Sequence, residues 1–281
     1  MRSLQGSVVR DRQLTGPWTQ RAHEKRTVAY TRAYHTGQPL EDMILIKRSL
    51  ALVSLLALAS VAALAQDSAS LVWKPKAGNT LKYKLQVKAS MEGQEFAFGT
   101  TITQKVLEVR QNGEVVVEGK QSNFTLSIAG EDMSAMMGDM AMTETSTMDR
   151  FGNVLSRKSD APAEMDNARL DQAILFVFPQ KADLKVGETW TRSVKADASK
   201  GQRAAEATFK FEGTETVNGI KSNKVTYTFV ETEGTAAMKV DAVIYLASED
   251  GELVKAEYKM KNLELGPGAP PSDATATIVR Q

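Results

Sequence analysis

The chain has 281 residues, a formal net charge of +1, no cysteine and only two histidines, His23 and His35. Because neither Cys nor His follows residue 35, the rest of the chain lacks the side chains for Ser-His-Asp or Cys-His catalysis and for His-ligated zinc or haem. Its basic residues are not clustered as a nucleic-acid footprint requires, so no nucleic-acid partner is expected.

A secretory signal peptide is predicted over residues 43–65. Lys47-Arg48 supplies the positive n-region, Ser49–Ala62 is almost wholly apolar, and Ala63-Leu64-Ala65 is a small-x-small cleavage site. The apolar run from Leu50 to Leu64 has 15 residues, whereas a membrane-spanning helix needs about 20. A cleaved signal is therefore preferred to an uncleaved anchor, and we expect a periplasmic or extracellular protein that meets the membrane only through this signal.

Residues 1–42 precede the signal and contain both histidines. They are Arg-rich and lack apolar periodicity, so the preferred interpretation is a start site placed upstream of the true one, with Met43 as the start. A genuinely extended signal, a disordered tail and a transit peptide are the alternatives, the last disfavoured by Glu24, Glu41 and Asp42. Of the whole chain, 26 of the 35 Lys and Arg and 30 of the 34 Asp and Glu lie in residues 66–281, which gives that part a net charge of about −4.

A first β unit is predicted over residues 66–158. Residues 81–88 alternate apolar and polar side chains without a break, which indicates a half-buried strand. Further strands are expected at 95–110, 114–128, 143–150 and 154–158, with Asn112-Gly113 and Gly152-Asn153 in the turns.

A linking helix is predicted within residues 159–179. Apolar side chains spaced by three and four run from Met165 to Phe178, and Pro179 is expected to end the helix. A second β unit follows over residues 180–265, with strands at 189–196, 204–216, 221–231, 235–247 and 253–263. The tail, 266–281, opens with Gly-Pro-Gly-Ala-Pro-Pro and is expected to be loosely ordered and unpaired.

The two β units resemble each other in sequence. Gly78-Asn79-Thr80-Leu81 corresponds to Gly187-Glu188-Thr189-Trp190, and residues 106–113 and 148–155 correspond to residues 211–219 and 247–254. The order is kept at an offset of roughly 100 residues, which favours a tandem duplication. Chance similarity between β meanders with glycine turns is the alternative. The expected fold is therefore mainly β, with antiparallel curved sheets of the half-barrel kind and two similar β units joined by one α-helix.

The most unusual segment carries five of the 12 methionines within ten residues, namely Met133, Met136, Met137, Met140 and Met142. Methionine adapts to varied apolar partners, so a flap over an apolar ligand is the preferred interpretation. Soft thioether sulfurs also select Cu(I), which leaves a copper carrier as an alternative, although carriers of that type add His or Cys. The third interpretation is that these methionines only fill space in the packing of the protein.

Other chemistries have weak support. No Gly-rich phosphate loop and no Gly-x-Ser-x-Gly elbow occurs, and no cofactor is expected. Carboxylates are numerous, for example Glu131, Asp132, Glu249 and Asp250, and paired acids could hydrolyse glycans if a cleft placed them face to face.

Pro179 to Trp190, ending in Val186-Gly187-Glu188-Thr189-Trp190, resembles a junction common in uncharacterised bacterial secreted β proteins. In those proteins a helix ends at a proline, and Val-Gly-Asp/Glu-x-Trp opens the second β half. The resemblance implies a bacterial envelope protein. By looser analogy, such curved sheets are similar to periplasmic half-barrels that hold lipids or lipoproteins.

The sequence thus favours an exported, non-catalytic binding or scaffold protein that holds an apolar ligand such as a lipid or binds another envelope component. A carboxylate-dependent glycan hydrolase and a soft-metal carrier are the alternatives.

Overall fold

The computed structural model describes residues 68–281 except 92, 139, 163–167, 199–200 and 265–269. All of these belong to one compact unit, Val61–Gln281. The leader and the predicted signal peptide, residues 1–65, lie outside the described residues. In the described part of the chain, no helix is long and apolar enough to cross a membrane.

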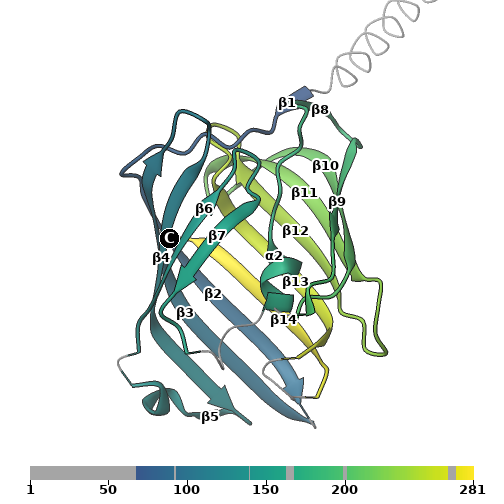
Figure 1. Ribbon diagram of the computed structural model, residues 1–281. Coiled ribbons are helices and arrows are strands. Elements are labelled where there is room, and N and C mark those ends of the chain that lie inside the picture. Colours follow the sequence, from purple (N-terminus) through teal and green to yellow (C-terminus); the bar gives the residue numbers. More distant parts are fainter. Residues whose placement is uncertain (1–67, 92, 139, 163–167, 199–200, 265–269) are drawn as a thin grey trace, which may run out of the picture. The chain divides into compact units, whose positions relative to one another are not determined.

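One antiparallel sheet of 12 strands dominates the fold (Figure 1). Its path runs β7-β6-β4-β3-β2-β14-β13-β12-β11-β10-β9, and β5 adds to the end of β4. The first group of strands is β2 (Thr80–Met91), β3 (Gln94–Val109), β4 (Val115–Ile128), β5 (Glu131–Asp132), β6 (Met142–Met148) and β7 (Val154–Ser159). The second group is β9 (Thr189–Val194), β10 (Ala205–Val217), β11 (Ile220–Glu231), β12 (Lys239–Ala247), β13 (Leu253–Leu263) and β14 (Ser272–Arg280).

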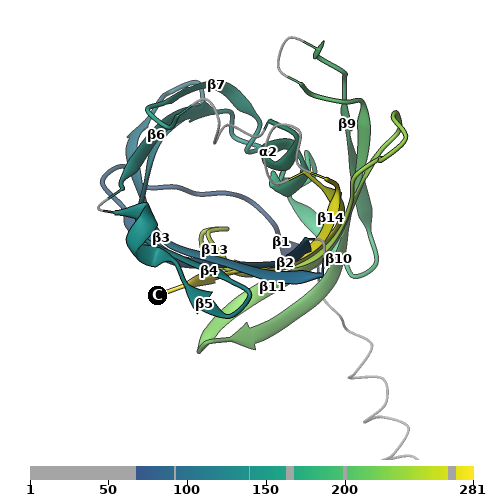
Figure 2. The ribbon, with the colours of Figure 1, turned by 90° about the horizontal axis from the view of Figure 1, so that it is seen from below.

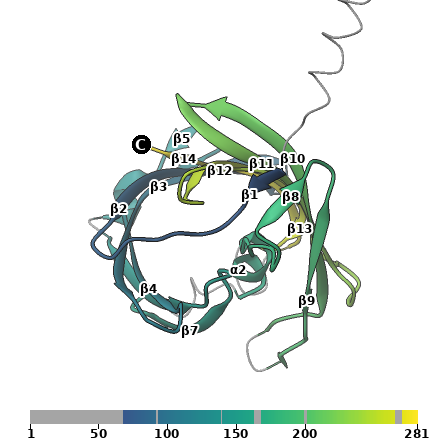
Figure 3. The same ribbon diagram turned by 90° about the horizontal axis from the view of Figure 1, so that it is seen from above.

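The sheet curls strongly, so that its two ends approach from opposite sides (Figures 2 and 3). β7 and β9 are its edges, and it does not close into a barrel. Register shifts bend individual strands, for example between Phe211 and Gly213 of β10, as β-bulges do. The prediction of a mainly β, antiparallel and curved fold with one small helix is confirmed.

The prediction for the tail was wrong over residues 272–280. These residues form β14, which pairs with β13 on one side and with β2 on the other. The strand alternates buried Ser272, Ala274 and Ala276 with more exposed neighbours. Its small side chains give a weak apolar pattern, and the preceding Gly-Pro run masks it.

The linking helix is shorter than predicted. Helix α2 covers Ala168–Ile174, and residues 163–167 are outside the description. The segment after Ile174 leaves the helix because Phe176 and Phe178 enter an aromatic cluster, with ring centroids 4.9 Å apart. The backbone N–H of Phe178 donates to the carbonyl of Phe151 at 2.7 Å instead of continuing a helix.

The two predicted β units have the same strand order within the sheet. β2-β3-β4-β6-β7 is a meander, and so is β9-β10-β11-β12-β13. The duplication itself stays a prediction. A small second sheet joins the units, because β1 (Ser68–Ser70) pairs with β8 (Asp183–Lys185).

The apolar core lies between α2 and the second group of strands. Its members alternate along β10–β13, as residues on one face of a sheet must. The largest fully buried side chains include Phe209, Phe211, Phe229, Met238 and Ile244.

Candidate ligand-binding face

We call the face of the sheet that carries this core the inner face. Over the second group of strands it is covered by α2 and the segment that follows. The hydroxyl of Tyr227 donates to the carbonyl of Ala173 at 2.7 Å, and Trp190 Nε1 donates to the carbonyl of Val177 at 2.7 Å. These bonds hold α2 and its extension against the sheet.

The inner face continues across β14 and β2 into the first group of strands. The register aligns Ala276 with Val87, Val87 with Phe98, and Phe98 with Leu126. Several apolar side chains of this part of the face are only half-buried. We define the inner apolar patch as Leu85, Val87, Phe96, Phe98, Ile102 and Leu126. One continuous face therefore has a filled part and an accessible apolar part.

A hollow of about 550 Å³ lies at the ends of β2, β3, β13 and β14. Phe96 of the inner apolar patch lines it, together with Ala89, Met260 and Ala274 from the same face. Three lysines and two carboxylates also line it: Lys88, Lys259, Lys261, Glu95 and Asp273. The hollow thus combines apolar and charged lining next to the patch.

The opposite end of the curled sheet is crossed by residues 71–79, which connect β1 to β2 and which we call the strap (Figure 3). Leu71 is fully buried, and Trp73 Nε1 donates to Glu252 Oε1 at 3.1 Å. Burial raises the pKa of the Glu252 carboxyl, because the charged form loses its hydration. Gly251 lets the strap approach, since a Cβ there would lie 2.5 Å from the carbonyl oxygen of Val72.

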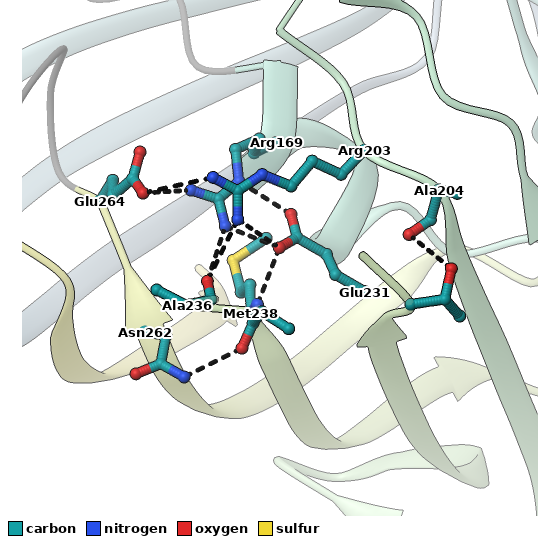
Figure 4. Close-up of polar contacts among 10 residues, drawn as sticks. Arg169, Arg203, Ala204, Glu231, Ala236, Met238, Asn262 and Glu264 are labelled. Carbon is teal, nitrogen blue, oxygen red and sulfur yellow. Dashed lines mark hydrogen bonds and ion pairs between the residues drawn. The ribbon is translucent and has the colours of Figure 1, made fainter. Parts of the chain in front are cut away.

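A charged cluster anchors α2 to the ends of β11 and β13 (Figure 4). Arg169 of α2 donates through Nε and Nη2 to the two oxygens of Glu231, at 2.8 and 2.7 Å, and its Nη1 lies 2.8 Å from Glu264. Arg203 adds contacts to both carboxylates, and the N–H of Met238 donates to Glu231 at 2.8 Å. The hydrogen bond to Glu231 raises the pKa of Arg169. The positive charges of the two arginines balance the negative charges of the two carboxylates, so we interpret the cluster as a structural anchor for α2.

A separate ion-pair network links α2 to β7, which is one edge of the sheet. Arg157 of β7 lies 2.6 Å from Glu144 of β6 and also pairs with Asp171 of α2. Burial alone would lower the pKa of Arg157, but the two carboxylates raise it overall. Both carboxylates are bound by one guanidinium, so their geometry gives the glycan-hydrolase alternative no support.

The methionine-rich segment follows β5 and passes through one turn of 3-10 helix, η1 (Ser134–Met137). Ser134 Oγ and the N–H of Met133 bond to the backbone of Leu126, which fixes this turn to the inner apolar patch. Met142 is buried on β6, Met133, Met137 and Met140 are half-buried, and Met136 is 72% exposed. Figure 2 shows β5, which precedes this segment, beside the wall of the sheet. The role of the segment as a flap stays a prediction, as does the copper alternative.

Sequence reasoning did not identify Arg157, Arg169, Glu231 or the Trp73–Glu252 contact. Arg169 and Glu231 are 62 positions apart, and Trp73 and Glu252 are 179 apart. The sequence did contain one signal for the Arg169 cluster. Glu231 occupies an apolar position in the alternation of β11, and a charged residue at such a position indicates a buried ion pair. Within the described ranges, no group of three or more His, Cys, Asp or Glu side chains is arranged to hold a metal ion.

No protein-family model matches the chain, and no curated protein matches it. Among solved structures, it is similar to a protein from Bacteroides fragilis NCTC 9343 described as a "putative exported protein with YmcC-like fold". The two share 12% sequence identity with a TM-score of 0.30, over 75% of this chain and 99% of that one. The comparisons therefore assign no family, and the function has to be argued from the inner face itself.

Proposed function

We propose that the protein is exported and binds an apolar ligand, such as a lipid acyl chain, on the inner apolar patch without catalysing a reaction. The observation that carries this proposal is the uneven cover of one face. Phe209, Tyr227 and Phe229 are buried on the second group of strands, whereas Phe96 and Phe98 on the first are only partly buried.

Apolar area removed from water contributes about 25 cal/mol per Å². The partly buried aromatic and aliphatic side chains of the inner apolar patch leave part of that gain to a ligand. The adjoining methionine turn supports the proposal, because thioether side chains adapt to apolar partners of varied shape. Export rests on the predicted signal of residues 43–65 and on the resemblance at Pro179–Trp190 to bacterial secreted β proteins.

The test begins with native mass spectrometry of protein purified from the exporting cell. We expect a retained lipid, and a mature N-terminus near Gln66. A retained copper ion would instead favour the soft-metal alternative, and a retained Met1 leader would count against export as described.

A binding experiment tests the location. The double variant Phe96→Ser/Phe98→Ser should bind a fluorescent apolar probe such as N-phenyl-naphthylamine at least about tenfold more weakly, which corresponds to about 1.4 kcal/mol. The matched control is Leu107→Ser/Val109→Ser, which removes two apolar side chains of β3 that are 42% and 43% exposed and outside the patch. Equal binding by both variants would place the ligand elsewhere, and no binding by the unaltered protein would refute the proposal.

A further inference from the structure

Arg192 is a partly buried cation that the proposed function does not use. It stands on β9 opposite fully buried Ala207, so its side chain enters the inner face beneath α2. Nη2 donates to the carbonyl of Gln172 at 2.5 Å, near the C-terminal end of α2. Nε is buried and has no hydrogen-bond partner among the described residues.

No described carboxylate lies within ion-pair distance of Arg192. This separates it from Arg157 and Arg169, each of which binds two carboxylates. Its burial lowers the pKa of the guanidinium, and the charged group that would offset this cost is missing from the described residues. Buried charges in proteins are paired as a rule, because an uncompensated one costs several kcal/mol.

Arg192 is one of the residues that line a hollow of about 530 Å³. Phe151, Phe178 and Trp190 give it aromatic walls, and Lys181 and Glu188, which also line it, form an ion pair at 2.8 Å. Arg192 is therefore the one uncompensated charge among the lining residues. The volume suits a small organic molecule.

We propose that this hollow is a second binding site, for a small aromatic carboxylate whose anionic group neutralises Arg192 while its ring lies against the aromatic walls. Arginine is well suited to this role, because its planar fork matches a carboxylate. The helix carbonyl of Gln172 holds the guanidinium in place and leaves its charge unpaired.

Isothermal titration with benzoate, benzyl alcohol and inorganic phosphate tests the proposal on the unaltered protein. We expect benzoate to bind at least about tenfold more tightly than either of the other two. Benzyl alcohol has the ring without the charge, and phosphate has the charge without the ring. If benzyl alcohol bound as tightly as benzoate, the proposed role of Arg192 would be wrong. If phosphate bound as tightly as benzoate, the proposed role of the aromatic walls would be wrong. No benzoate binding would overturn the site.

Variants then locate the binding. Arg192→Gln should lose benzoate affinity at least about tenfold, whereas Arg110→Gln, which removes one exposed charge from the turn after β3, should keep it. Without ligand, Arg192→Gln should unfold at the same temperature as the unaltered protein or higher, because it removes an unpaired, partly buried charge. If Arg192 served only to hold α2, the variant would instead unfold at a lower temperature and bind benzoate unchanged once folded. Phe96→Ser/Phe98→Ser should leave benzoate binding intact, which separates this site from the inner apolar patch.

Discussion

At the scale of single residues, Gly251 controls how closely the strap approaches the sheet. Its φ of +77° disfavours any side chain, and a Cβ would also meet the carbonyl of Val72 at 2.5 Å. Gly251→Ala should therefore lower the free energy of unfolding by about 2–4 kcal/mol, measured by urea denaturation. The control is Gly219→Ala, at φ +78° with open space around it, where only the backbone cost of about 1–2 kcal/mol applies. Equal losses would show that the strap does not press on Gly251.

Glu252 makes stability depend on pH in an uncommon direction. Its pKa is raised in the folded state, first by burial and then by Asp250, so the folded protein binds the proton more tightly than the unfolded chain. Stability from this group is therefore gained as pH falls toward the ordinary carboxyl range, and lost as pH rises through the folded pKa.

Glu252→Gln keeps an oxygen that can accept from Trp73 and removes the titration. In thermal unfolding, the midpoint of the variant relative to the unaltered protein should be higher at pH 7.5 than at pH 5. A difference that does not change with pH would show that Glu252 does not titrate in this range.

At the scale of elements, α2 is held by ion pairs as well as by apolar contacts. Removing Glu231 leaves Arg169 without its main partner, and the Arg169 side chain is only 10% exposed. Glu231→Ala should cost about 3–5 kcal/mol in the free energy of unfolding, because breaking a buried pair leaves a buried charge. Glu257→Ala, which breaks the exposed pair with Lys255 at 2.9 Å, should cost less than about 1 kcal/mol. A similar cost for both variants would show that the Arg169 cluster contributes little.

β14 is the strand that joins the two groups. Proline at Ala276 removes a backbone donor from a strand with partners on both sides, and should cost about 3 kcal/mol or more. Far-ultraviolet circular dichroism during urea denaturation would measure it. Ser156→Pro, in edge strand β7, is the comparison, and a larger loss there would contradict the central position of β14.

At the scale of the whole molecule, the sequence was informative where a strand has large apolar residues on one face. The period of two predicted β13 with the observed bounds, Leu253–Leu263, and placed β2 and β11 within a few residues. It failed for β14, whose inner face carries Ser and Ala, and for α2, where tertiary packing of Phe176 and Phe178 overrides the helical spacing.

The two candidate sites could not be predicted from the sequence. One depends on a part of the inner face that α2 leaves uncovered, and the other depends on an arginine that no described carboxylate reaches. The alternation of residues 81–88 predicts one apolar face for β2, but only the position of α2 shows which part of the inner face is covered. Likewise, nothing in the order of residues distinguishes Arg192 from Arg169. The difference is that carboxylates reach one of them and none in the described residues reaches the other.

The pairing of β2 with β14 also constrains when this protein can fold. The paired residues Lys84 and Val279 are 195 positions apart, so one edge of β2 stays bare until all the strands between β2 and β14 have emerged. Contacts this distant in sequence form slowly, and a bare edge can pair with the wrong chain in the meantime. A chain that crosses a membrane unfolded would assemble its sheet only after the crossing, and during that interval we expect it to depend on a holding chaperone on the far side.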